Sequence, residues 1–412
     1  MAPMRTFELR AHTPNGAAFV EAAERFATEF TDGALAHDRD GTFATEHLDK
    51  LRADGFLVAP IPSMLGGGGV MSVHDVLVGA SRLARGDAAT AIGVNMHLGI
   101  VLNVVRQWQI YCSRDDAAKA AATAASLRAI VELDLVMSAP VSEPSPQDLG
   151  RPSTTARRVD GGWVVNGRKA FATMSPHATL MNVAVTYVGE DGTERYGFAL
   201  IPPGAPGVSF HHDWDALGMR ASDSGSVSFH DVRLGADALR DGFPIGAFSA
   251  PMLERFLVSG AFHAAASLGI AESAQARIVE TLSGRAATTL DDPHAVMRLA
   301  ENVVDLSAMR ATFDRAAALI DEHFAEFATG TPPTTAAQAM FAEVQAAKAL
   351  LNEAGSRVVD RALALSGGAG FMARNPLAKA WRDARAGAFM HPLGANRAYD
   401  FIARVALGAE PR

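Results

Sequence analysis

The stretch WVVNGRKAFATMSPHATLMNVAVTY, residues 163–187, holds two apolar runs joined by a polar and aromatic segment. The first run predicts a strand because tryptophan and β-branched valine favour a pleated backbone, and Asn166-Gly167 after it is a strong signal for a hairpin turn. The second run predicts another strand. Between them, Phe171 and Thr173 put a flat apolar ring beside a hydroxyl, which suits a planar cofactor. An ordinary hairpin in a β-domain fits the same residues, because a single short motif is weak evidence.

Further strand signals lie on both sides of this stretch. Between about residues 134 and 245, the sequence is rich in proline, glycine and β-branched residues, whereas the preceding sequence is rich in alanine. Turn signals such as Asp191-Gly192 separate short apolar runs. This part of the chain therefore predicts an antiparallel β-domain. Its predicted strands are 133–138, 163–166, 180–187, 196–201, 208–210, 226–229 and 232–234.

The sequence on either side of the β-domain has helical spacing, with glycines near the ends of the helical segments. The run 88–108 is apolar on nearly every face, which predicts a buried helix. Four long segments near the C-terminus, joined by short connections, predict a four-helix bundle. The predicted helices are 17–30, 43–54, 72–85, 88–108, 249–282, 292–327, 334–365 and 376–389. We therefore predict an α+β fold with an N-terminal α-helical domain (1–133), a central antiparallel β-domain (134–245) and a C-terminal four-helix bundle (246–412).

Composition narrows the class of protein. The 412 residues carry a formal net charge of −8, so nucleic acid is not an expected partner, because phosphate binding needs a basic face. Cys112 is the only cysteine, which leaves no intrachain disulfide. Residues 1–16 lack the apolar core of a secretory signal, and no uninterrupted apolar run is long enough to span a bilayer. We expect a cytoplasmic protein with no membrane partner.

One polar cluster suggests a metal site at first sight. His211 and His212 precede Asp213. Adjacent histidines in a strand point to opposite faces, so they do not easily share one ion. We predict no metal site there.

Several motifs, in the right order, resemble those of the acyl-CoA dehydrogenase superfamily. NGRKAFAT, ending at Thr173, resembles the flavin-contacting "NGxKxWITN" hairpin, and VSEP, starting at Val141, resembles the "TEP" element. LGMRAS and VSFHDV further on resemble "LGMRGS" and "VxFxDV". The resemblance covers nearly the whole chain and implies the acyl-CoA dehydrogenase architecture with a bound flavin, FAD or FMN. It implies flavin contacts at Val141, Ser142, Phe171 and Thr173.

The resemblance also implies an assembly. Arg285 lies 16 residues after Gly269, the family spacing of an arginine that contacts the flavin diphosphate across subunits. Gly367 and Gly368 correspond to family glycines that meet the flavin of a neighbouring subunit. The bundle helices are rich in alanine, as at 264–266 and 346–347, and the family uses such a face to make tetramers, so the resemblance implies a homotetramer, with a dimer as the fallback.

A family dehydrogenase needs a glutamate base, which resemblance places at one of two positions. In the C-terminal motif, here RDARAGAFMH, His391 stands where the glutamate would be. On the first helix of the bundle, the register puts Ser259 at the alternative position. Glu254 lies five residues earlier in a family-like Glu254-Arg255 pair, so it can act as the base only if the helix is shifted.

A branch of the superfamily consists of monooxygenases that receive reduced flavin from a separate reductase and use oxygen. The chain resembles this branch in His97 on the apolar helix, the Thr173 hydroxyl and His391. A neutral imidazole and a hydroxyl can move a proton near neutral pH, although His97 also fits an ordinary core histidine. We predict a flavin-dependent monooxygenase of a small organic substrate. The alternatives are an acyl-CoA or acyl-carrier dehydrogenase that uses Glu254 for α,β-desaturation, and a non-catalytic member of the fold.

Overall fold

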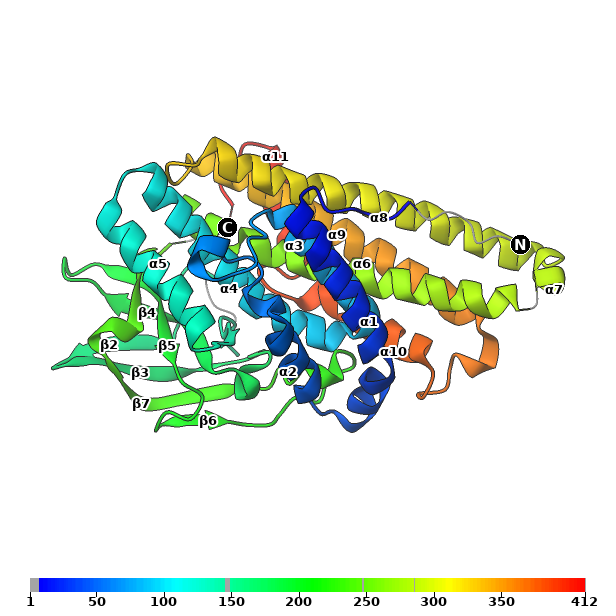
Figure 1. The fold of residues 1–412 in the computed structure, drawn as a ribbon, viewed down its shortest axis with the longest axis horizontal. Coiled ribbons are helices and arrows are strands. Elements are labelled where there is room, and N and C mark those ends of the chain that lie inside the picture. The colour runs from blue at the N-terminus through cyan, green and yellow to red at the C-terminus, as the bar shows by residue number, and fades with distance from the viewer. Residues whose placement is uncertain (1–6, 145–148, 247, 285, 412) are drawn as a thin grey trace.

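The computed structural model describes residues 7–144, 149–246, 248–284 and 286–411. It confirms the predicted α+β fold, with helices towards both ends of the chain and a sheet in the middle. Figure 1 shows the strands gathered at one end of the molecule and the long C-terminal helices running away from them. The division into three domains at residues 133 and 245 stays a prediction.

Five helices form the N-terminal part, and local sequence explains their ends. The side chains of Thr13, Ser72 and Asp87 accept hydrogen bonds from the first turns of α1, α3 and α4. Gly41 ends α1 and Gly55 ends α2, each in the left-handed conformation that favours glycine. The helices are α1 (Pro14–Asp40), α2 (Thr45–Asp54), α3 (Val73–Gly86), α4 (Ala88–Ser113) and α5 (Ala117–Glu132).

Among the described residues, α4 is the one helix long and apolar enough to cross a membrane, which differs from the expectation that the chain holds no such run. The helix is largely buried and packs against α3, α5 and α6. It is therefore a core helix, as its apolar character on every face predicted.

The central sheet is mostly antiparallel, in the order β6-β7-β3-β2-β4-β5-β8. Two pairings, β2 with β4 and β1 with β4, are parallel, which the sequence did not predict. β2 and β8 were also not predicted, and the two predicted strands around 226–234 form one strand, β7. The strands are β1 (Met137–Ser138), β2 (Thr155–Val159), β3 (Gly162–Lys169), β4 (Leu180–Val188), β5 (Glu194–Ile201), β6 (Val208–Phe210), β7 (Val227–Gly235) and β8 (Leu239–Pro244).

The Asn166-Gly167 pair does not form the predicted hairpin turn. β3 continues through it, and the pair lies at an irregularity in the β3–β7 pairing. There Asn166 exchanges hydrogen bonds of 2.9 and 3.0 Å with Asp231. A Cβ at Gly167 would lie 2.5 Å from the hydroxyl of Thr154, so glycine is needed for the close approach of two chain segments rather than for a turn.

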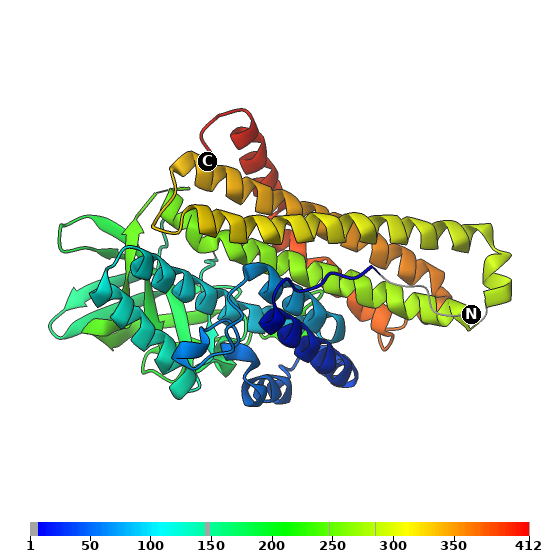
Figure 2. The same cartoon turned by 45° about the horizontal axis from the view of Figure 1, so that its top comes forward.

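The C-terminal part is built on three long helices that run side by side, α6, α8 and α9, in both Figure 1 and Figure 2. Their bounds agree with the predicted ones to within a few residues. The predicted fourth helix is shorter, because α10 gives way to a 3₁₀ turn, η7. The elements are α6 (Ala250–Ser283), α7 (Ala286–Leu290), α8 (Pro293–Glu326), α9 (Thr334–Leu365), α10 (Pro376–Ala384), η7 (Ala386–Phe389) and α11 (Ala395–Ala406).

Candidate functional site

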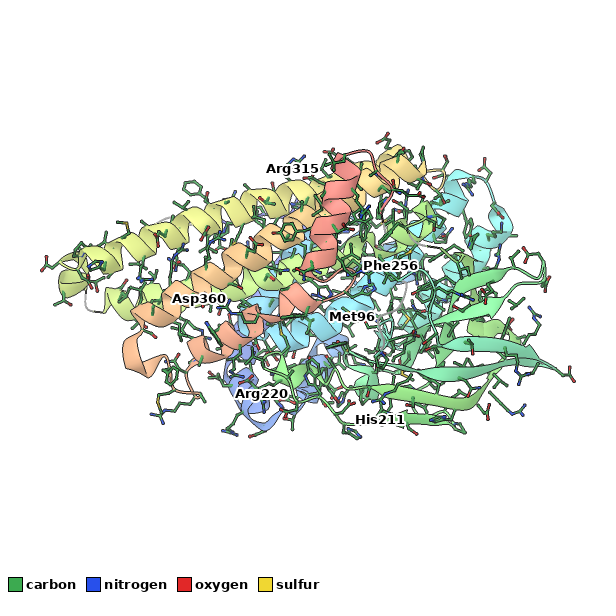
Figure 3. All side chains as sticks on the ribbon, turned by 180° about the vertical axis from the view of Figure 1, so that it is seen from behind. Met96, His211, Arg220, Phe256, Arg315 and Asp360 are labelled. Atoms are coloured by element: carbon green, nitrogen blue, oxygen red, sulfur yellow. The ribbon has the colours of Figure 1, made fainter. Side chains whose placement is uncertain are left out.

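A cavity of about 520 Å³ opens where the sheet meets the helices. Its walls come from α4, from the segments that flank β3, from the N-terminal half of α6 and from the chain after α10. Figure 3 labels Met96 on α4 and Phe256 on α6, which both line it. The volume and the mainly apolar lining are those of a small-molecule or cofactor site.

The segment between β3 and β4 forms one wall. Phe171 has a left-handed backbone (φ 53°), and its side chain is 60% exposed, with its ring edge-on to Trp214 at 5.9 Å between centroids. The hydroxyl of Thr173 lies 2.8 Å from that of Ser224, which in turn lies 2.7 Å from that of Ser222. A non-glycine residue at positive φ persists only where its surroundings hold it. The wall thus presents an exposed aromatic ring and an oriented hydroxyl to the cavity.

A buried ion pair fixes the wall next to this segment. Glu143 accepts from Lys169 Nζ at 2.7 Å and from the backbone and hydroxyl groups of Ser153 and Thr154. Lys169 also donates to the carbonyl of Val141, at 3.3 Å. These partners hold the pKa of Glu143 down at about 2 against the effect of burial. Val141 and its neighbour Ser142, both cavity-lining, are therefore anchored to β3.

Two imidazoles also line the cavity. His391 and His263 line the cavity, and His391 Nε2 and His263 Nδ1 have no hydrogen-bond partner in the described part of the chain. Burial, reinforced by nearby Lys348, lowers the pKa of His391 to about 3 and that of His263 well below its usual value. Both rings are therefore neutral at pH 7, and each keeps a buried nitrogen without a protein partner among the described residues.

Lys348, on α9, holds the segment that carries His391. Its Nζ donates to the carbonyls of Met390 (2.6 Å) and Leu393 (2.9 Å), on either side of the histidine. Burial lowers the pKa of Lys348 to about 7. The sequence analysis missed Lys348 and His263. His263 lies four residues after Ser259 on the same face of α6, which was the available signal.

Glu254 does not line the cavity. Its carboxylate pairs with His323 of α8 at 2.7 Å. Ser259 does line the cavity, and its hydroxyl donates to the carbonyl of Phe256. The acidic residues among the described cavity lining are Asp213, which accepts from Ser226, and Asp215, which is solvent-exposed. No buried carboxylate is therefore present in the described lining.

His97 also lies outside the cavity lining. Nε2 donates to the carbonyl of Leu57 at 3.1 Å, and Nδ1 accepts from the N–H of Met137 at 3.0 Å. Burial lowers the pKa of His97 to about 4. Both ring nitrogens are occupied by backbone, so in this structure His97 joins the N-terminal helices to the sheet and does not face a ligand.

The remaining predicted cofactor residues lie elsewhere. Gly367 and Gly368 sit in a 3₁₀ turn that follows α9, away from the cavity lining. Arg285 lies outside the described residues. The cavity thus gathers His391 with four of the predicted flavin contacts, Val141, Ser142, Phe171 and Thr173.

The cavity fits a flavin. A planar ring needs an apolar slot with a few polar groups at its edge, and the exposed Phe171 ring and the Thr173 hydroxyl supply both. Buried polar atoms are normally paired, yet Asn95 Oδ1 and Asn182 Oδ1 in the lining have no partner among the described residues. Unpaired polar atoms of this kind are expected where a ligand completes the site.

Comparison with known proteins extends these observations. Three domains of the acyl-CoA dehydrogenase family match the chain: the N-terminal domain at 13–108, the middle domain at 141–232 and the C-terminal domain at 250–396. The amino sugar nitrososynthase RubN8 of Streptomyces rubradiris is 32% identical, across 97% of this chain and 91% of the relative. The putative acyl-CoA dehydrogenase YdbM of Bacillus subtilis is also 32% identical, across 91% and 93%.

Solved structures with a similar fold include one with bound FMN. KijD3 in complex with FMN and dTDP-3-amino-2,3,6-trideoxy-4-keto-3-methyl-D-glucose superimposes with a TM-score of 0.85 and 30% identity. The match covers 97% of this chain and 96% of KijD3. The predicted superfamily and the predicted flavin are both supported. The chain belongs to the acyl-CoA dehydrogenase family and is a flavin-dependent oxidoreductase.

Proposed function

We propose that this protein is a two-component monooxygenase that takes reduced FMN from a separate reductase and uses oxygen to oxidise a small organic substrate. The observation that carries the proposal is the wall formed by His263 and His391. By the resemblance, His391 and Ser259 occupy the two positions where a dehydrogenase keeps its carboxylate, and the one glutamate considered as a base, Glu254, is paired with His323 outside the cavity lining.

The chemistry balances with the groups at hand. Reduced flavin supplies two electrons; one oxygen atom enters the substrate and the other leaves as water, which takes up two protons. His391 Nε2 and His263 Nδ1 are unpaired atoms that can pass those protons to a bound ligand. Thr173 orients one edge of the cofactor, and the apolar lining keeps bulk water from the reacting atoms. Val141 and Ser142 are proposed as cofactor contacts because Lys169 and Glu143 hold them rigid.

Relatives support this choice. Besides the nitrososynthase and the FMN complex already described, a probable FMNH2-dependent monooxygenase of Pseudomonas putida, SfnC, is 28% identical over 74% of this chain. FMN is therefore our choice of flavin. Since nitrososynthases are named for amino sugars, an amine-bearing substrate is the first class to test.

A specific observation also favours a second candidate, an acyl-CoA dehydrogenase. YdbM, whose printed name is a putative acyl-CoA dehydrogenase, is as similar as the nitrososynthase. This candidate needs Glu254 to leave His323 and enter the cavity, or a base not recognised in the lining.

We also propose a homotetramer in the cytoplasm, with a dimer as the second choice. Phe371 is 86% exposed and Met372 45%, next to the glycines expected to meet a neighbouring subunit. Exposed apolar side chains that lie together favour burial between subunits. A sedimentation mass equal to one 43.3 kDa chain would exclude it.

The cofactor proposal is tested by anaerobic titration of the purified protein with oxidised and with reduced FMN. Tighter binding of reduced FMN, together with no NADH or NADPH oxidation unless a reductase is added, supports a two-component enzyme. Rapid NADH oxidation by the protein alone would exclude it.

A further inference from the structure

Arg255 is a partly buried cation with no anionic partner in the described part of the chain. It lies on α6 and lines the cavity. Its guanidinium stacks over the ring of Phe198, 4.4 Å from the centroid. No described carboxylate lies within ion-pair distance, in contrast to the buried Arg82, which pairs with Glu272. A partly buried charge that lines a cavity and has no protein partner is available to a ligand that supplies the opposite charge.

A second unpaired group lies on the same side of the sheet. Asn182, on β4, is 2% exposed, lines the cavity and has an Oδ1 atom without a partner. Residues two apart in a strand share a face, so Asn182 shares its face with Ala184, and Phe198 of β5 lies directly opposite Ala184. Asn182 and the Phe198–Arg255 stack therefore border the same part of the cavity. The Nδ2 group of Asn182 is the donor that can bind an anion, whereas the unpaired Oδ1 is an acceptor and does not itself indicate one.

The backbone beneath Arg255 is firmly held. Nδ2 of Asn103 on α4 donates to the carbonyls of Gly99 (2.9 Å) and Arg255 (3.2 Å), which ties α4 to α6 at this point. The next residue on α6, Phe256, packs against the ring of His391. A fixed guanidinium thus borders the same cavity as the two imidazoles, and fixed donors bind an anion at a smaller cost in conformational entropy.

We infer that Arg255 and Asn182 form an oxyanion subsite that binds a carboxylate or phosphate group of the substrate. The inference rests on the proposed function for the identification of the ligand as a substrate, and it deepens that function: the substrate class becomes a small organic anion. A planar guanidinium binds such groups through two parallel hydrogen bonds, which a neutral analogue cannot form with the same strength. The other possible source of the oxyanion is the phosphate of the flavin itself.

The test uses the FMN-loaded full-length protein, with two acids, acetate and benzoate, each compared with its neutral amide at constant ionic strength. Binding is followed by calorimetry and by perturbation of the flavin absorbance. We expect at least one acid to bind about tenfold more tightly than its amide, since a hydrogen bond to a charged group is worth more than a neutral one. Arg255→Met should remove the preference, and Arg255→Lys should keep part of it. Arg385→Met is the matched control, because Arg385 lines the same cavity but pairs with Asp360, and it should keep the preference.

Equal affinities of acids and amides for the wild-type protein would overturn the inference, as would a preference that survives Arg255→Met. The affinities of FMN and riboflavin distinguish the source of the anion. If Arg255→Met changes the affinities for FMN and riboflavin by the same factor, a substrate subsite is supported. A selective loss of FMN affinity would assign Arg255 to the cofactor phosphate and overturn the inference. None of these measurements needs oxygen or a reductase, so a failure here is separate from a failure of the proposed monooxygenase.

Discussion

The imidazole of His391 lies edge-on to the ring of Phe256, with 4.8 Å between ring centroids and 67° between their planes. Phe256 fixes the orientation of the histidine, and Lys348 holds the backbone on both sides of it. Nε2 remains unpaired among the described residues. A fixed neutral imidazole in a shielded cavity is suited to passing protons to and from a ligand.

The first prediction concerns His391. Replacing it with alanine should send more of the consumed oxygen to hydrogen peroxide, because the reacting oxygen loses a fixed hydrogen-bond partner. The rate of peroxide release from the FMNH2-loaded protein after mixing with oxygen should rise several-fold, as expected for the loss of one hydrogen bond worth about 1 kcal/mol. His211→Ala is the control, since His211 is exposed and outside the cavity lining, and it should leave the rate unchanged. Equal rates in His391→Ala and the wild type would remove His391 from the proposed chemistry.

The second prediction concerns Thr173, whose hydroxyl is oriented by Ser224. Thr173→Val keeps the shape of the side chain and removes one hydrogen bond, worth about 1 kcal/mol. FMN affinity should fall several-fold, as measured by fluorescence titration. Thr123→Val on the exposed face of α5 serves as the control. Unchanged FMN affinity in Thr173→Val would show that the hydroxyl does not contact the flavin.

The third prediction concerns pH and Lys348. Its pKa is about 7 in the folded protein and 10.5 in its ordinary state, so between these values the unfolded chain binds a proton that the folded protein does not. Stability must therefore rise with pH in this window. The Lys348→Met variant has no titratable amine at this position. The free energy of unfolding of the wild type, relative to that of Lys348→Met, should increase from about pH 7 towards pH 10.5 in urea titrations. A difference that stays constant over this range would mean that Lys348 is an ordinary, solvated lysine.

The fold could be predicted from the sequence wherever hydrophobic periodicity was strong. The three long C-terminal helices were found to within a few residues, and so was β4, an apolar run buried almost throughout. β2 was missed because its sequence, TARRV, has two arginines and little apolar character, and β8 because LRDGFP contains an Asp-Gly pair and a proline. Both strands are specified by their neighbours in the sheet rather than by local preference.

The candidate site was predictable where a motif carried it and not elsewhere. Phe171, Thr173 and His391 line the cavity as the motifs indicated. His97 has the sequence context of a ligand-facing histidine, but only the fold shows that Leu57 and Met137 occupy its nitrogens. The sequence identified Arg255 only as half of a motif. That this cation lines the cavity without an anionic partner among the described residues depends on three-dimensional packing.

The most direct test of the central claim is the anaerobic mixing of the oxidised FMN-loaded protein with straight-chain acyl-CoA thioesters while the flavin absorbance is recorded. A monooxygenase without a carboxylate base should leave the flavin oxidised with every thioester, because neither a buried imidazole nor Ser259 readily removes a weakly acidic proton from carbon. Loss of the flavin absorbance on addition of a thioester, abolished by Glu254→Gln, would contradict the account and identify the protein as a dehydrogenase.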